Sequence, residues 1–129
     1  MTDALTQADR LAGRRELGKR SEDIGASWLA SRGMRIIERN YRCPLGEIDL
    51  VGMLDDTLVI VEIRSRTSDR CGAPAESITY RKKQRLRRLA SYYLCQKGMI
   101  NWPCRFYVLG VLCGGDESGP QIEWFPNAF

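Results

Sequence analysis

Hydrophobic residues follow a helical period in two parts of the chain. The first part predicts a helix over about Arg15–Arg32, which Gly33 ends because glycine readily adopts the left-handed conformation after a last turn. The second part predicts a helix over about Tyr80–Lys97, with Thr79 as its N-cap and Gly98 after its end. The buried stripe of this second helix is predicted to comprise Leu86, Leu89, Ala90, Tyr93 and Leu94.

Short runs of branched and aromatic residues, bounded by turn residues, predict strands in the rest of the chain. The predicted strands cover residues 34–42, 46–51, 58–64, 104–113 and 121–125. Pro74 is predicted to open a short helical turn before the second helix. The order helix, three strands, helix, one or two strands predicts an α/β fold with a mixed central sheet of 4–5 strands flanked by helices.

The length of 129 residues suits one compact domain, which we assign to residues 13–129 after a flexible N-terminal tail of residues 1–12. No apolar run approaches the roughly 18–20 residues that span a bilayer. The polar start of the chain also lacks the apolar centre of a signal peptide. The sequence therefore predicts a cytoplasmic protein without a membrane partner.

The absence of histidine narrows the chemistry that this chain can perform. It excludes Ser-His-Asp and Cys-His catalysis, histidine-based nucleases and the usual zinc hydrolases. The five cysteines form no Cys-x-x-Cys pair, which predicts reduced, mostly buried thiols and no zinc site. Hydrolytic chemistry would therefore depend on carboxylates, a bound metal ion, or lysine and arginine.

Two carboxylates and an arginine interrupt the strands predicted over residues 46–51 and 58–64. Successive side chains of a strand point to opposite faces, so Glu62 and Arg64 share one face. If the two strands pair, Asp49 lies beside Glu62, and two converging carboxylates attract a divalent cation. Asp49, Glu62 and the main-chain carbonyl of Ile63 are therefore candidate ligands for Mg²⁺ or Mn²⁺. A cross-strand ion pair without a metal is the alternative.

The second predicted helix begins with a dense row of positive charge. Residues 81–88 carry six basic side chains and no acid that would pair with them one turn away. Such a row repels itself, and a phosphate backbone relieves that repulsion. We predict that Arg81, Lys82, Arg85 and Arg88 contact nucleic acid, while an ordinary solvated helix face is the alternative.

Four segments together resemble the bacterial YraN-like family. They are Gly-Glu-Ile-Asp-Leu-Val from residue 46, Val-Glu-Ile-Arg-Ser-Arg from residue 61, Gly-Ala-Pro-Ala-Glu-Ser-Ile-Thr from residue 72, and the terminal Pro-Asn-Ala-Phe. The resemblance runs from about residue 13 to the end and implies membership of the restriction-endonuclease-like, PD-(D/E)XK nucleases, similar to archaeal Holliday-junction resolvases. It implies a restriction-endonuclease-like core that cleaves phosphodiesters with a divalent metal.

Position by position, the resemblance implies a catalytic set of Glu22 on the first helix, Asp49 on the second strand, and Glu62 and Arg64 on the third. The residues alone also allow another interpretation of Glu22, a boundary position whose carboxylate reaches water or an arginine. Relatives carry lysine where Arg64 stands, and arginine stays protonated whereas lysine can be tuned toward neutrality. Two hypotheses follow: slow cleavage in which the metal ion activates the water, or a degenerate site that binds without cutting.

The sequence thus predicts a metal-dependent nuclease-like protein that acts on DNA, branched or single-stranded, with catalysis altered at Arg64. RNA stays open as a substrate, and a homodimer is an option because junction-resolving relatives are dimers. One alternative is a non-catalytic nucleic-acid-binding module on the same fold. Another is a protein-interaction subunit that presents exposed aromatic residues near Trp102, Trp124 and Phe129.

Overall fold

The computed structural model describes residues 7–66, 79–112 and 119–126. Within these ranges the chain forms a helix, three strands, a second helix and two more strands, which confirms the predicted order and the α/β class. The elements are α1 (Gln7–Ser31), β1 (Arg35–Cys43), β2 (Gly46–Leu54), β3 (Thr57–Arg66), α2 (Tyr80–Gln96), β4 (Cys104–Leu112) and β5 (Gln121–Phe125). The turn predicted at Pro74 and the aromatic side chain of Phe129 lie outside the described residues.

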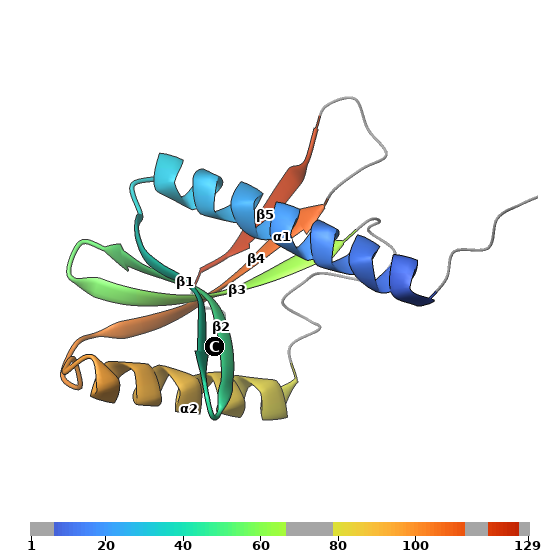
Figure 1. Ribbon diagram of the computed structural model, residues 1–129. Helices are drawn as coiled ribbons and strands as arrows, with labels where there is room; N and C mark the ends of the chain where they lie inside the picture. Colours follow the sequence, from blue (N-terminus) through green and yellow to red (C-terminus); the bar gives the residue numbers. More distant parts are fainter. Residues whose placement is uncertain (1–6, 67–78, 113–118, 127–129) are drawn as a thin grey trace, which may run out of the picture.

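The strands form one mixed sheet in the order β1-β2-β3-β4-β5. Neighbouring strands run antiparallel except β3 and β4, which are parallel. A parallel pair needs a crossover connection, and α2 lies in that connection on one face of the sheet. The helix α1 covers the opposite face (Figure 1). The layers are therefore helix, sheet and helix, as the sequence predicted.

The helix α2 begins and ends where the local sequence indicated. Thr79 has an extended backbone, and its Oγ1 accepts a hydrogen bond from the Lys82 amide at 3.2 Å, which makes it the N-cap. The helix ends at Gln96, and Gly98 follows with a φ of 70°. Its buried residues are Leu86, Leu89, Ala90 and Tyr93. They confirm four of the five predicted stripe positions, and Leu94 is half-buried.

The helix α1 ends as predicted and begins earlier than predicted. After Ser31, Gly33 takes a φ of 93° and donates its amide to the Ala30 carbonyl at 3.0 Å. The helix starts at Gln7, eight residues before the predicted start and inside the segment assigned to the tail. The predicted start of the helix was wrong because it followed the apolar stripe, whereas alanine, arginine and glutamine extend a helix without one.

Two apolar clusters, one on each face of the sheet, hold the layers together. The cluster between α1 and the sheet comprises Ala26, Leu29, Met34, Leu50, Val59, Val61, Tyr107, Leu109 and Val111. The cluster between α2 and the sheet comprises Tyr41, Ile48, Val51, Met53, Leu58, Ile60, Leu86, Leu89, Ala90 and Tyr93. Gly25 brings α1 close to the sheet, since a Cβ at this position would lie 2.9 Å from Leu109 and 3.2 Å from Ile63. The contact fixes α1 directly over β3 and β4.

The aromatic residues predicted at the surface do not all lie there. Trp102 is exposed, but Trp124 packs edge-on against Trp28 with ring centroids 5.2 Å apart, and its ring lies 5.7 Å from that of Tyr107. The prediction was wrong for Trp124 because β5 continues the sheet beneath α1, where an aromatic side chain adds to the core.

Cys95 is exposed, whereas Cys43 and Cys104 are half-buried, and none of these three thiols forms a disulfide. The expectation of mostly buried thiols was therefore wrong for Cys95. Among the residues that the structure describes, no helix has both the length and the apolar composition needed to cross a bilayer.

Candidate functional site

The candidate site lies where β2 separates from β3. The antiparallel pairing of these strands runs from Leu54–Thr57 to Leu50–Val61. The next residue of β2 is Asp49, and its carboxylate Oδ2 accepts a hydrogen bond from the Ile63 amide at 2.8 Å. Asp49 therefore lies beside the peptide that joins Glu62 to Ile63, which is the juxtaposition expected if the two strands paired.

The strand β2 changes face at Asp49. Ile48 belongs to the cluster under α2 and Leu50 to the cluster under α1, although residues two apart share a face of a regular strand. Beyond this point the β1–β2 hairpin turns away from the sheet toward α2 (Figure 1). The bend leaves the edge of β3 open beside residues 62–64, and the Asp49 carboxylate occupies that opening.

The surroundings of Asp49 disfavour its negative charge. The pKa of Asp49 is raised from 3.8 to about 7, first because burial desolvates the carboxylate and then because the charge of Glu62 lies close by. The hydrogen bond from Ile63 opposes this rise, and the charges of Glu22 and Glu47 add to it. A cation placed among these carboxylates would therefore favour the ionised form of Asp49.

Glu62 is nearly buried and is paired with two cations. Its Oε1 lies 2.8 Å from the Nζ of Lys82 and 3.6 Å from the Nη1 of Arg64. The Glu62 side chain is 11% exposed, whereas those of Lys82 and Arg64 are about 30% exposed. Two positive side chains therefore meet on one oxygen of a nearly buried carboxylate, and the closer one comes from α2.

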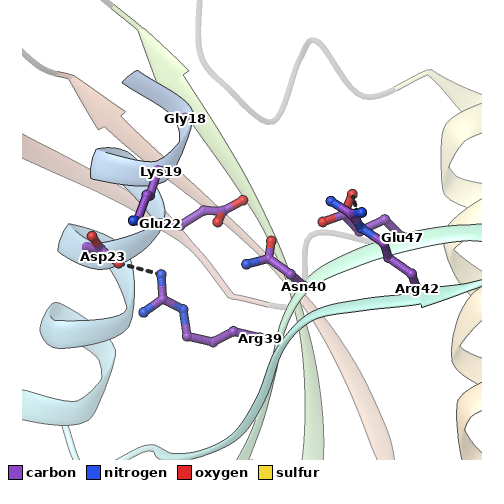
Figure 2. A pocket seen from close by; sticks show the side chains of 8 residues that line it. All are labelled: Gly18, Lys19, Glu22, Asp23, Arg39, Asn40, Arg42 and Glu47. Carbon is purple, nitrogen blue, oxygen red and sulfur yellow. Dashed lines mark hydrogen bonds and ion pairs between the residues drawn. The ribbon is translucent and has the colours of Figure 1, made fainter. Parts of the chain in front are cut away.

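Glu22 and Glu47 face each other across an open groove of about 640 Å³ between α1 and the β1–β2 hairpin. Figure 2 shows Glu22 directed from α1 into this groove, with Asn40 between it and Glu47. On α1 the ion pair with an arginine is made by Asp23, whose Oδ1 lies 2.6 Å from the Nη2 of Arg39. The groove therefore adds acidic groups next to Asp49.

Three of the four residues predicted to contact nucleic acid form an exposed face. Arg81, Arg85 and Arg88 are exposed and follow one another at helical spacing along α2. Arg85 reaches the hairpin, because a Cβ added to Gly46 would lie 3.4 Å from its Nε. Lys82 is half-buried and turns instead to Glu62. We call Arg81, Arg85 and Arg88 the basic face.

The oxygen atoms at the bend fit a hard divalent cation. Mg²⁺ commonly takes one or two protein carboxylates and completes its shell with water and substrate oxygens. Asp49 and Glu62 supply two such carboxylates, and the carbonyl of Ile63 stays a predicted third ligand. Among the described residues, no three histidine, cysteine, aspartate or glutamate side chains form a ready cage. Glu22 acts on the Asp49 charge more weakly than Glu62 does, which suits a position outside the ligand pair.

The sequence did not assign Glu47 and Lys82 to this site. The spacing could have indicated Glu47 as a site residue, because it lies two residues before Asp49 in the same strand. Lys82 was instead predicted to contact nucleic acid. Only the packing of α2 brings it to Glu62, which lies twenty residues earlier in the chain.

Comparisons with known proteins agree with the motifs found in the sequence. The model of the uncharacterised protein family UPF0102 matches residues 21–111. The UPF0102 protein of Moorella thermoacetica is 46% identical over 116 residues, which cover 90% of this chain and 97% of that protein. The UPF0102 protein of Pelotomaculum thermopropionicum is 47% identical with the same coverage, and that of Hahella chejuensis is 41% identical over 88% of this chain and 90% of its own length.

Proposed function

The chain belongs to the uncharacterised protein family UPF0102, the YraN-like family that its motifs resemble, and we propose that it is a metal-dependent nuclease that acts on DNA. The observation that supports this most is the meeting of Asp49 and Glu62 at the peptide of Ile63. Two carboxylates forced together in a partly buried place are expected to hold a cation. An exposed basic face beside them is suited to a phosphate backbone.

In this proposal Asp49, Glu62 and the Ile63 carbonyl hold Mg²⁺ or Mn²⁺. The bound ion would polarise the phosphodiester and lower the pKa of an attacking water. Arg64 remains protonated, so it would stabilise negative charge on the phosphoryl oxygens and would not accept a proton. The basic face would hold the DNA backbone while Glu22 limits the approach of further anions from the groove.

One observation favours a second candidate function, a nucleic-acid-binding module that does not cut. Glu62 is already paired with both Lys82 and Arg64, so these two cations would compete with a metal for its carboxylate. If the ion pairs persist when metal and DNA are present, the site contributes only binding. Metal affinity and cleavage must therefore be measured separately.

The test is a calorimetric titration of the metal-free protein with Mn²⁺, followed by cleavage assays in Mg²⁺. The substrates are single-stranded, duplex and four-way-junction DNA, with the matching RNAs. Asp49→Asn should weaken Mn²⁺ binding at least about tenfold because it removes one of two anionic ligands. Asp55→Asn is the matched control, since it makes the same change at an exposed turn whose φ of 52° asparagine tolerates.

Equal Mn²⁺ affinity in the Asp49→Asn variant and the parent protein would refute the metal site. Metal binding that depends on Asp49, without cleavage of any substrate, would favour the binding module. Cleavage that Asp49→Asn abolishes and Asp55→Asn retains supports the nuclease, and the substrate cut fastest identifies its class.

A further inference from the structure

The most unexpected contact of the site is the one between Lys82 and Glu62. From it we propose that Lys82 is a catalytic residue: its ammonium leaves Glu62 when the divalent cation binds and then contacts the scissile phosphate. This inference rests on the proposed nuclease function and adds a residue that the strand motif does not contain. It moves Lys82 from the nucleic-acid contacts predicted along α2 to the reacting centre.

The distances favour Lys82 over Arg64 as the cation closer to the Glu62 carboxylate. The Lys82 Nζ lies 2.8 Å from the Glu62 Oε1, within hydrogen-bonding distance, whereas the Arg64 Nη1 stands at 3.6 Å. Ammonium and a divalent metal both require the oxygens of Glu62. An ammonium that the metal displaces from Glu62 starts next to the metal, and so within reach of a phosphate that the metal holds.

The fold holds the backbone of Lys82 in a fixed position near Glu62. Its amide donates to the N-cap Thr79, and the buried residues of α2 hold the helix on the sheet. The Lys82 side chain itself is a flexible four-carbon stem, about 30% exposed. Lys82 can therefore move its ammonium a short distance from Glu62 to a substrate oxygen without any movement of the helix.

Lys82 is also set apart from its basic neighbours. The basic face is exposed to solvent. Lys82 follows Arg81 directly in the helix, so its side chain points about 100° further around the helix axis, toward the sheet. Lys82 thus belongs to the site and the three arginines to the surface. The two groups predict different consequences: loss of an arginine weakens DNA binding, whereas loss of Lys82 changes metal affinity and the rate of the chemical step.

The experiment compares the parent protein with Lys82→Gln, Lys82→Arg and Arg64→Lys. Lys82→Gln should bind Mn²⁺ about five- to tenfold more tightly, because a positive charge next to the metal is removed. It should nevertheless cleave about 100-fold more slowly in single turnover at saturating Mn²⁺, because a charge that stabilises the transition state is lost. The opposite direction of these two changes distinguishes a catalytic cation from a structural support of Glu62, whose loss would weaken both.

The other two variants test charge and position. Lys82→Arg restores the charge and should recover at least about tenfold of the lost rate. Arg64→Lys should not raise the cleavage rate by a large factor, since an ammonium is already present at the site. Lys97→Gln is the matched control, because it removes one ammonium from the opposite end of α2, about 20 Å away. Its Mn²⁺ affinity and rate should equal those of the parent.

Unchanged or weaker Mn²⁺ binding in Lys82→Gln would overturn the role of Lys82, even where Asp49→Asn shows that the metal site exists. A large rise in rate in Arg64→Lys would also overturn it, because it would mean that the missing amine belongs on β3. Mn²⁺ binding that Asp49→Asn does not affect, or a parent protein that cleaves no substrate, would instead refute the nuclease on which this inference rests.

Discussion

Replacing Asp49 with asparagine should stabilise the metal-free protein at high pH while it weakens metal binding. Asp49 is a largely buried carboxyl group whose charge is opposed by desolvation and by Glu62. Asparagine has nearly the same shape and carries no charge. Its side-chain oxygen can accept the same hydrogen bond from the Ile63 amide. The substitution therefore removes the electrostatic penalty and leaves the local geometry in place.

The size of the effect follows from the pKa of Asp49, which is about 7 in the folded protein against an ordinary 3.8. Below pH 4 both folded and unfolded states hold the proton, so the group contributes nothing. Between pH 4 and pH 7 the unfolded chain releases the proton and the folded protein retains it, so the free energy of unfolding falls by about 1.4 kcal/mol per pH unit. The full loss, reached above pH 7, is about 4 kcal/mol.

The assay is urea denaturation of the parent and Asp49→Asn at several pH values from 4 to 8.5, without divalent cations. The difference between the two proteins cancels the titration of all other groups. Asp49→Asn should gain on the parent by about 3 kcal/mol between pH 5 and pH 8. Added Mn²⁺ should restore much of the parent's stability at pH 8, because it binds only the folded site, and should leave the variant unchanged.

Parallel stability curves for the two proteins across this pH range would refute the reasoning. They would mean that Asp49 carries its charge in the folded protein without a cost in stability, so that the carboxylates of Asp49 and Glu62 do not repel each other appreciably. A gain that appears with rising pH and disappears in Mn²⁺ would support a site built for a cation.

Three further predictions concern the supports of the site. Thr79→Ala should lower the free energy of unfolding by about 1 kcal/mol in urea denaturation because the N-cap bond to the Lys82 amide is lost, while Thr79→Ser should lower it much less. Gly25→Ala should lower it by about 1–2 kcal/mol, since the clash with Leu109 exceeds the gain in helix propensity; a more stable variant would contradict the close approach of α1. Replacing Arg85 and Arg88 together with glutamine should reduce the slope of log DNA affinity against log salt by about 2, measured by fluorescence anisotropy, and an unchanged slope would remove the basic face from DNA binding.

The sequence determined the features that depend on neighbouring residues. Thr79 and Gly98 set the ends of α2, and Gly33 set the end of α1, because caps act within one turn of the backbone. The alternation of apolar residues located the strands and put Glu62 and Arg64 on one face. The start of α1 could not be found in this way, since its first turns show no apolar stripe.

The neighbourhood of Asp49 and Glu62 could be predicted only on the assumption that their strands pair, which the short turn between them favoured. The bend at Asp49, which turns its carboxylate to the Ile63 amide, breaks the regular alternation and leaves no local signal. The direction in which the Lys82 side chain points is even harder to predict from the sequence. It depends on the rotation of α2 over the sheet, which the buried side chains of the whole helix set together, so only the tertiary structure decided which of six basic residues reaches Glu62.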